Sequence, residues 1–351
     1  CIGCELEKTD SELVEGRCTL HPNKDLEVRE EENYFFRFSK YQTALLELYK
    51  SKPQFVVPDF RLKEITAFVK GGLRDFSVSR LKEKMPWGVP VPDDVEHVMF
   101  VWFDALTSYI STLGWPKDEV GDYAKFWVEG KKIQVAGKDN LRQQSAIWQA
   151  MLLSAQLPNS DQIVIGGFIN SGGQKMSKSL GNTISPYELV GRYGTEATRY
   201  LLLRHVHPFD DTDITWNRLD EWYTANLVNG LGNLVARVMK MAESHLDSPV
   251  TRPETCNFDE EYTKAFDVHN LQQVCDIVWV KVGKLDERIT SEEPFKLVKV
   301  DQEKARKIIV ELVIELYVIG RLLNPIMPET SNAIKEAILV NKKPENLFKR
   351  L

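Results

Sequence analysis

The stretch Gly172-Gly173-Gln174-Lys175-Met176-Ser177-Lys178-Ser179-Leu180-Gly181-Asn182 divides the chain into two parts with different patterns. Glycines at both ends of the stretch allow backbone conformations that residues with side chains resist. Lys175 and Lys178 place two ammonium groups between the glycines. Serine hydroxyls and backbone N–H groups can surround phosphate oxygens. The composition therefore predicts a loop that binds a polyphosphate, although a solvated loop with clustered charges has the same composition.

Short apolar runs alternate with helical patterns before this stretch. The runs are His97–Phe103, Ile133–Ala136 and Gln162–Ile165, and we expect helices over 105–113 and 140–156 between them. A continuous apolar run is typical of a strand that is buried on both faces. Strands and helices that alternate at this spacing predict an α/β fold with a doubly wound parallel sheet.

Polar residues follow the ends of these predicted strands. Asp104 follows the first strand, Gly137-Lys138-Asp139 follow the second, and a loop begins after Gly166. Because ligands bind outside the carboxyl ends of parallel strands, we expect these residues to lie near a ligand. Asp139 has a second interpretation, as the cap of the helix that follows it.

The part after the signature stretch is almost entirely helical. Long apolar patterns with helical spacing cover 219–245, 262–289 and 303–323, with shorter helical patterns before and after them. Helices of this length with short connections predict an antiparallel helical bundle in a domain of its own.

Two pairs of potential metal ligands lie near the start of the chain. Cys1 and Cys4 are separated by two residues, and so are Cys18 and His21. Four sulfur and nitrogen ligands suit tetrahedral zinc, and the short spacing favours a closed, structural site. A redox pair or a disulfide between Cys1 and Cys4 is the alternative.

The composition limits the class of protein. The 351 residues are enough for two or three domains, and the formal net charge of −6 requires any nucleic-acid binding to use locally clustered lysines and arginines. No apolar run reaches the roughly 18 residues of a membrane span, so no membrane partner is expected. Cys256 and Cys275 are predicted to be buried thiols in a reducing cytoplasm. Because the chain begins with Cys1, we also expect that its natural N-terminus is missing.

Residues 175–179 read KMSKS, which is the signature of class I aminoacyl-tRNA synthetases. Four further motifs occur in the order expected for the methionyl-tRNA synthetase family: Gly72-Leu73-Arg74-Asp75-Phe76, Val101-Trp102-Phe103-Asp104-Ala105, Gly137-Lys138-Asp139 and Gly232-Asn233-Leu234-Val235-Ala236-Arg237. Together with the Cys/His pairs, they make nearly all of the chain resemble that family. The HIGH motif and the first half of the family's nucleotide-binding sheet do not occur here, so we expect the chain to be inactive alone.

The resemblance implies a division into four parts. These are a zinc knuckle over 1–38, the second half of a Rossmann-type catalytic domain over 39–170, the KMSKS loop with a stem-contact region over 171–216, and a helical-bundle anticodon-binding domain over 217–351.

The resemblance also implies an activity. Members of the family use ATP, with Mg²⁺, to activate methionine as methionyl-adenylate, and then transfer the methionyl group to the terminal adenosine of tRNA(Met). Lys178 would offset the charge that develops on the leaving pyrophosphate, and Lys175 would hold the loop or the phosphates. The implied ATP-binding residues are Gly137, Lys138, Asp139, Lys175, Ser177 and Lys178.

The implied methionine pocket contains Trp102, Ala105 and Tyr109, because a thioether packs well on aromatic rings. Trp102 could instead be an ordinary core residue. The family pattern predicts Phe-His where this chain has Gln143-Gln144. Gln144 is therefore expected in the pocket as a neutral group that can both donate and accept hydrogen bonds.

Three residues of the helical part match positions that read the tRNA anticodon in the family. Asn233 and Arg237 lie one helical turn apart, and Phe295 stands where a tryptophan often stacks on a base. The alternatives are a solvated charge at Arg237 and an interhelical hydrogen bond at Asn233. For the whole protein, the alternatives are another class I synthetase or a tRNA-binding module without catalysis.

Overall fold

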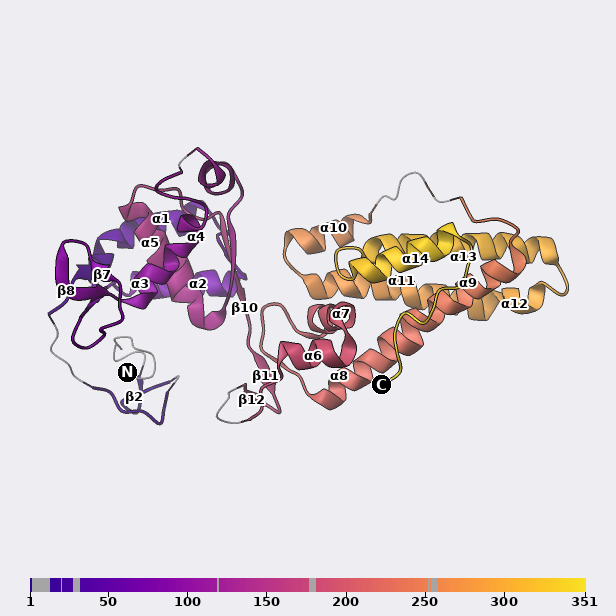
Figure 1. The fold of residues 1–351 in the computed structure, drawn as a ribbon, viewed down its shortest axis with the longest axis horizontal. Coiled ribbons are helices and arrows are strands. Elements are labelled where there is room, and N and C mark those ends of the chain that lie inside the picture. Colours follow the sequence, from indigo (N-terminus) through magenta and orange to yellow (C-terminus); the bar gives the residue numbers. More distant parts are fainter. Residues whose placement is uncertain are drawn as a thin grey trace. The chain divides into compact units, whose positions relative to one another are not determined.

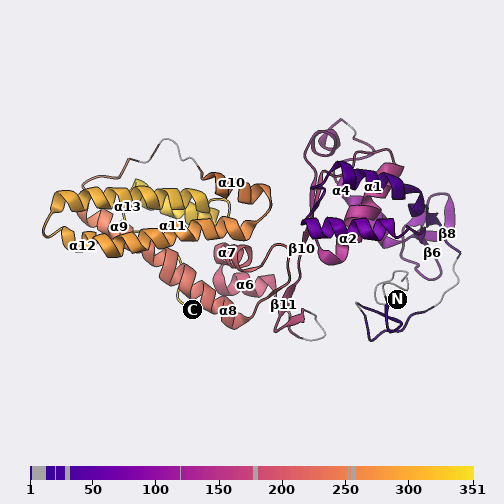
Figure 2. The same cartoon turned by 180° about the vertical axis from the view of Figure 1, so that it is seen from behind.

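The computed structural model describes residues 1, 13–19, 21–27, 32–118, 120–176, 181–251, 253 and 258–351. The chain forms two compact units, Cys1–Ile165 and Gly166–Leu351. Strands and helices are mixed in the first unit, whereas helices make up most of the second (Figures 1 and 2). This division agrees with the predicted change from an α/β pattern to a helical one.

The first unit contains a three-stranded sheet with the order β4-β10-β9, formed by Val56–Val57, Gln162–Gly166 and Ile133–Gly137. Strand β10 pairs with β4 in parallel, with Ile163 opposite Val56. Ile163 and Ile165 are fully buried and share one core with helices α1 (Gln42–Ser51), α2 (Asp59–Lys70) and α5 (Trp148–Ser154). The strand predicted over 162–165 is confirmed as β10, and the structure places it at the centre of this sheet.

The prediction of a buried parallel strand over 97–103 is wrong. Strand β8 (Asp94–Met99) pairs antiparallel with β6 (Ser79–Leu81) and β7 (Pro90–Val91), in a separate sheet. Val101 already belongs to helix α3 (Val101–Leu106), and its side chain is exposed. An apolar run alone does not show whether a strand continues to its end or is followed directly by a helix.

The other elements of the first unit surround these sheets. They are β1 (Leu13–Val14), β2 (Arg17–Cys18), β3 (Phe35–Phe36), β5 (Phe76–Ser77), α4 (Ser108–Ser111), 3₁₀ helices over Phe38–Tyr41 and Lys138–Asn140, and π-helical segments over Tyr123–Val128 and Gln143–Ile147. The predicted helices over 105–113 and 140–156 therefore exist, each in several pieces.

The second unit begins with a small sheet of order β12-β11-β13, formed by Gln174–Lys175, Ile169–Ser171 and Thr212–Asp213. Its helices are α6 (Pro186–Tyr193), α7 (Thr195–His205), α8 (Trp216–Trp222), a π-helical segment (Tyr223–Gly232), α9 (Asn233–His245), α10 (Glu260–Asp267), α11 (Leu271–Glu292), α12 (Pro294–Leu297), α13 (Gln302–Leu323) and α14 (Pro328–Leu339).

Helices α9, α11, α13 and α14 lie side by side in both views and share one apolar core (Figures 1 and 2). The predicted bundle is therefore present. A single helix over 262–289 is wrong, because His269 takes a φ of +59° between α10 and α11. The Asn270 side chain then accepts a hydrogen bond from the Gln273 N–H at 3.1 Å, which caps α11. Among the helices of the described residues, none combines the length and apolar character of a membrane span.

His205 lies at the end of α7 and packs against the bundle. Its ring stacks on Trp222 with a centroid distance of 4.2 Å and an interplanar angle of 3°. Burial, together with the positive charge of Arg204, lowers the pKa of His205 from 6.5 to about 4. His205 is therefore neutral in the folded protein near pH 7.

This depressed pKa predicts a loss of stability in acid. Between about pH 4 and pH 6.5 the unfolded chain binds more protons at His205 than the folded chain does, so the free energy of unfolding falls as the pH is lowered through this window. His205→Phe, which keeps a ring on Trp222 but cannot be protonated, should weaken this pH dependence. Thermal unfolding of the helical unit from pH 4 to pH 7 measures the effect, with His245→Gln as the matched control.

Candidate functional site

The first half of the signature stretch forms a β-hairpin. Strands β11 and β12 pair antiparallel, with Asn170 opposite Lys175. Gly172 and Gly173 form the turn with φ angles of +64° and +76°. A side chain at either position would be strained in this left-handed region, so glycine is needed twice in succession. The predicted use of these glycines for a tight backbone conformation is therefore confirmed.

Two side chains hold the hairpin in place. The Gly173 N–H donates a hydrogen bond to Oδ1 of Asp213, on the neighbouring strand β13, at 2.7 Å. Asn182, at the other end of the signature stretch, donates from Nδ2 to the Ser171 carbonyl at 3.3 Å and to the Lys175 carbonyl at 3.4 Å. Both ends of the stretch are thus attached to the same small sheet.

Lys175 is exposed at the end of β12, with its Nζ 4.2 Å from the centroid of the Phe168 ring. Its ammonium group therefore lies against an aromatic ring directly before β11, on a side chain that is otherwise exposed. Ser177 and Lys178 lie outside the described residues.

The predicted nucleotide-binding residues follow strand β9. Gly137 is its last residue, and Lys138–Asn140 form a short 3₁₀ helix directly after it. Asp139 is exposed, and one oxygen of its carboxylate accepts a hydrogen bond from Nδ2 of Asn140 at 3.3 Å. The structure thus places Gly137, Lys138 and Asp139 at the carboxyl end of a strand, as predicted.

The predicted methionine-pocket residues lie on short helices of the first unit. Trp102 is 42% exposed on α3 and Tyr109 is 37% exposed on α4, and Ala105 is also exposed. The alternative that Trp102 is an ordinary core residue is therefore wrong. Gln144 is buried and donates from Nε2 to the Tyr109 hydroxyl at 2.9 Å. The structure thus brings Tyr109 and Gln144 together across a sequence separation of 35 residues.

The predicted metal ligands meet in the N-terminal segment. The ligand atoms of Cys1, Cys18 and His21 all lie within 4.8 Å of one another, and the Cys1 Sγ is 3.9 Å from the His21 Nδ1. Zn–S and Zn–N bonds of about 2.3 and 2.0 Å give a sulfur–nitrogen distance of roughly 3.6 Å in a tetrahedral site. The three groups therefore fit a zinc ion. Cys4, the fourth predicted ligand, lies outside the described residues.

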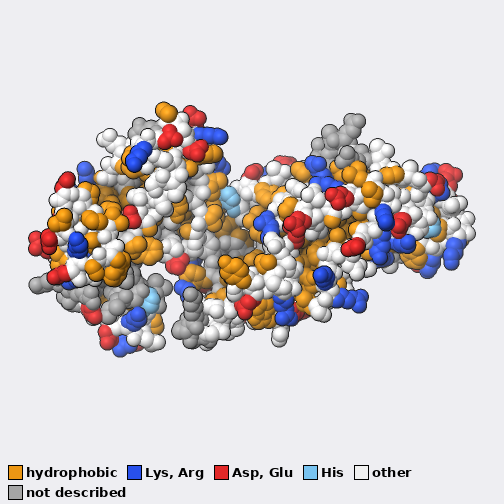
Figure 3. All heavy atoms as spheres, viewed as in Figure 1, with side chains coloured by type: hydrophobic (Ala, Val, Ile, Leu, Met, Phe, Trp, Pro, Cys, Tyr) orange, Lys and Arg blue, Asp and Glu red, His pale blue; other side chains and the backbone are white. Residues whose placement is uncertain are grey.

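The three predicted tRNA-reading residues lie on the bundle. Asn233 begins α9, and Arg237 follows one turn later. The Arg237 Nη1 forms an ion pair with Oδ1 of Asp286 on α11 at 2.5 Å, so Arg237 is not an isolated solvated charge. Phe295 on α12 is exposed. Over the face shown in Figure 3, basic and acidic side chains are interspersed rather than separated.

Comparison with known proteins places this geometry in a family. The family model described as "tRNA synthetases class I (M)" matches residues 1–239. The chain belongs to the class I methionyl-tRNA synthetase family. A methionine–tRNA ligase from a Nostoc species is 37% identical over 96% of this chain and 66% of the relative. The corresponding ligase from Thermotoga maritima is 34% identical over 98% of this chain and 56% of the relative.

A solved relative has the same fold. The Mycobacterium tuberculosis methionyl-tRNA synthetase in complex with methionyl-adenylate is 30% identical, with a TM-score of 0.82 over 94% of this chain and 68% of that one. The present chain thus spans slightly less than two thirds of the length of the Nostoc relative and about half of that of the Thermotoga relative.

Sequence reasoning missed three residues of this methionyl-tRNA synthetase family member. Asp213 and Asn182 anchor the signature hairpin, and Gln134 is a buried amide in strand β9. One feature of the sequence could have indicated Gln134, because it is the polar residue in an otherwise apolar strand pattern. Nothing in the sequence distinguishes Asp213 from the acidic residues just before it.

Asp213→Ala should loosen the signature hairpin. The Gly173 N–H would lose a charged acceptor, and a hydrogen bond to a charged group contributes about 1.5–3 kcal/mol when it is protected from water. Because Asp213 is partly exposed, we expect exchange of the Gly173 amide with deuterium to accelerate only about three- to tenfold. Asp210→Ala, in the same loop, is the matched control. Unchanged exchange at Gly173 would show that Asp213 does not hold the turn.

Proposed function

We propose that this protein is a methionine–tRNA ligase. It would form methionyl-adenylate and pyrophosphate from methionine and ATP, and then transfer the methionyl group to the 3′-terminal adenosine of tRNA(Met). The observation that carries the proposal is the KMSKS sequence over 175–179, whose first residue, Lys175, lies on the second strand of the glycine hairpin. The named relatives, which are methionine–tRNA ligases, support it.

In this proposal the signature lysines neutralise phosphate charge. Adenylate formation breaks the bond between the α-phosphorus and the leaving pyrophosphate, which gains negative charge in the transition state. Lys178 supplies an ammonium group for that charge, and Lys175 and Ser177 contact the phosphates. Gly137, Lys138 and Asp139 contact the nucleotide from the end of β9, where Asp139 is exposed. Mg²⁺ accompanies ATP.

The methionine side chain would bind beside Trp102, Ala105 and Tyr109, with Gln144 behind the tyrosine. Exposure of Trp102 and Tyr109 in the same unit as buried Gln144 supports this assignment. A polarizable thioether gains contact energy on aromatic rings, which distinguishes methionine from polar amino acids.

Asn233, Arg237 and Phe295 would read the anticodon of tRNA(Met) from the bundle. Phe295 can stack on a base, and Arg237 can donate to one after its ion pair with Asp286 rearranges or is shared. We also propose that the domains run over 1–38, 39–170, 171–216 and 217–351, and that the protein acts in the cytoplasm.

The N-terminal segment would hold a structural zinc ion through Cys1, Cys4, Cys18 and His21. Zinc supplies folding energy to a segment with little apolar core, and here these residues hold the metal without any role in the reaction.

Lys178→Ala should slow methionine-dependent ATP–pyrophosphate exchange in the full-length protein by about 10²-fold or more, because a cation that stabilises transition-state charge is lost. Binding of tRNA(Met) should change little. Lys63→Ala, on the exposed face of α2, is the matched control for loss of a lysine. An exchange rate equal to that of the wild type would count against the assigned role of Lys178.

Removal of zinc by a chelator should expose the segment before about Tyr34 to proteolysis while the helical unit stays folded by circular dichroism. Cys18→Ser should lower the zinc content measured by mass spectrometry. Cys275→Ala should leave it unchanged, because burial raises the pKa of the Cys275 thiol to about 12 and keeps it protonated. Equal zinc contents in the wild type and in both variants would contradict the site.

A further inference from the structure

Phe168 lies directly before strand β11, and its ring contacts the first lysine of the signature. The Lys175 Nζ is 4.2 Å from the centroid of this ring. An ammonium group within about 6 Å of an aromatic face is attracted by the negative charge density of the ring. Strand pairing brings the two residues together, because Asn170, which follows Phe168 on β11, lies opposite Lys175. The contact therefore joins the two strands of the hairpin.

The acidic residues beside the hairpin are engaged with other groups. Asp213 accepts the Gly173 N–H through Oδ1 at 2.7 Å, and its Oδ2 is 4.0 Å from Nη1 of Arg218. Asp211 accepts the Phe168 N–H at 3.0 Å. In the part of the chain that the structure describes, no carboxylate forms an ion pair with the Lys175 ammonium group.

The ring and a carboxylate would hold this ammonium group in different ways. A carboxylate neutralises the charge and accepts the N–H donors that an anionic ligand also needs. The face of an aromatic ring attracts the cation but carries no net charge. Lys175 can therefore be held against Phe168 and still offer its positive charge and its donors to an anion.

The backbone of Phe168 is held by the segment before β13. Its N–H donates to Oδ1 of Asp211 at 3.0 Å, and its carbonyl accepts the Thr212 N–H at 2.9 Å. Gly167 permits this approach, because a Cβ there would lie 2.3 Å from the backbone carbonyl of Asp210. Both backbone polar groups of Phe168 are thus bonded, which determines the point from which its ring extends.

This arrangement restricts a side chain that is otherwise flexible. Lys175 is exposed, and a long lysine side chain loses rotamer freedom when it binds a ligand. A contact that already restricts the side chain before the ligand arrives reduces that cost. The ring of Phe168 supplies such a contact on a backbone that is itself fixed.

We propose that Phe168 is a positioning residue that holds the ammonium group of Lys175 ready for the phosphates of ATP, and that Asp211 fixes the backbone from which the ring extends. The inference rests on the proposed function and adds to it two residues outside the KMSKS string. Phe168 does not contact the phosphates itself and acts only through Lys175.

The test changes the charge distribution of the ring while keeping its shape. Trifluorophenylalanine at position 168 of the full-length protein has a similar size, but its fluorine atoms withdraw negative charge from the ring face. Methionine-dependent ATP–pyrophosphate exchange gives kcat, and KM for each substrate. We expect KM for ATP to rise about two- to fivefold, while kcat and KM for methionine change little. Phe168→Leu should have the same effect, and Phe168→Tyr should not.

Two controls separate this role from a general structural one. In the Lys175→Ala background the fluorinated ring should cause no further change, because the cation on which it acts is absent. The matched control is the pair Lys125 and Phe126 in the first unit, in which the Nζ lies 4.9 Å from the centroid of an exposed ring. Trifluorophenylalanine at position 126 should leave KM for ATP unchanged.

Substitutions of Asp211 test the second part of the inference. Asp211→Ala removes the acceptor of the Phe168 N–H and should raise KM for ATP in the same direction as the fluorinated ring. Asp211→Asn keeps an oxygen acceptor and should restore a value close to that of the wild type. Equal effects of the two substitutions would show that Asp211 does not act through this hydrogen bond.

The outcomes also distinguish this inference from the proposed function. A wild-type protein without methionine-dependent exchange would contradict the proposed function. An active wild-type protein whose KM for ATP is insensitive to fluorination at position 168 would overturn the inference alone. So would an equal rise in KM with and without Lys175, because an effect that survives the loss of the lysine arises from the fold and not from the ammonium group.

Discussion

Burial of strand β10 is the constraint on which the rest of the first unit depends. Ile163 and Ile165 are buried on one face of the strand and Val164 on the other, so both faces are covered and the buried backbone groups must be paired at both edges. Strand β4 pairs with it on one side and β9 on the other, and helices α1, α2 and α5 contribute to its core. This arrangement determines where β9 ends, and hence where Gly137, Lys138 and Asp139 lie.

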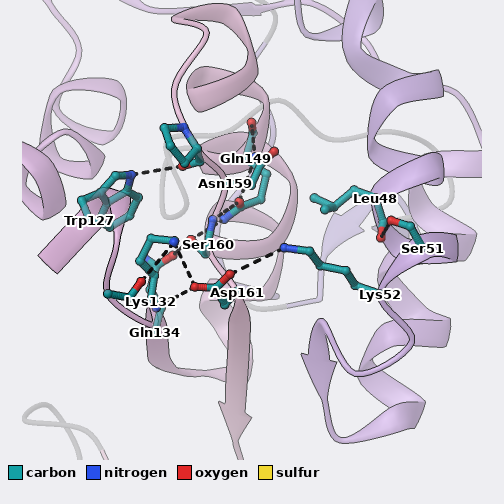
Figure 4. Close-up of polar contacts among 12 residues, drawn as sticks. Leu48, Ser51, Lys52, Trp127, Lys132, Gln134, Gln149, Asn159, Ser160 and Asp161 are labelled. Carbon is teal, nitrogen blue, oxygen red and sulfur yellow. Dashed lines mark hydrogen bonds and ion pairs between the residues drawn. The ribbon is translucent and has the colours of Figure 1, made fainter. Parts of the chain in front are cut away.

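The pairing of β10 with β9 also brings polar side chains together in the interior of the first unit. Ser160 and Asp161 stand just before β10, and Gln134 lies on β9 beside them. The Asp161 carboxylate accepts the Lys132 N–H at 2.8 Å and lies between the ammonium groups of Lys132 and Lys52 (Figure 4). Burial opposes ionisation of Asp161, but these hydrogen bonds and charges lower its pKa on balance. The hydrogen-bonded pair Ser160 and Gln134 is thus adjacent to a strand end that is itself held by ion pairs.

The sequence predictions are accurate where residues close together in the chain decide the structure, and less accurate where distant residues do. Apolar periodicity predicts α13 within one residue at its start, because 11 of its 22 residues are buried on one helical face. It fails at 97–103, where an apolar run changes from strand to helix, and at His269, where one residue with positive φ divides a predicted helix. Gln144 is predicted in the pocket from the resemblance alone, but its hydrogen bonds are not predictable from its neighbours.

By itself, the sequence determined the features that depend on adjacent residues. These are the signature string, the paired glycines of its turn, the ligand pairs near the N-terminus and the helical character of the second half. Only the tertiary structure decided which strand pairs with β10, that Asp213 holds Gly173, and that Gln134 connects Ser160 to Gln144. The physical reason is that hydrogen-bond direction and strand pairing depend on groups far apart in the chain, 40 residues for Asp213 and Gly173 and 26 for Ser160 and Gln134.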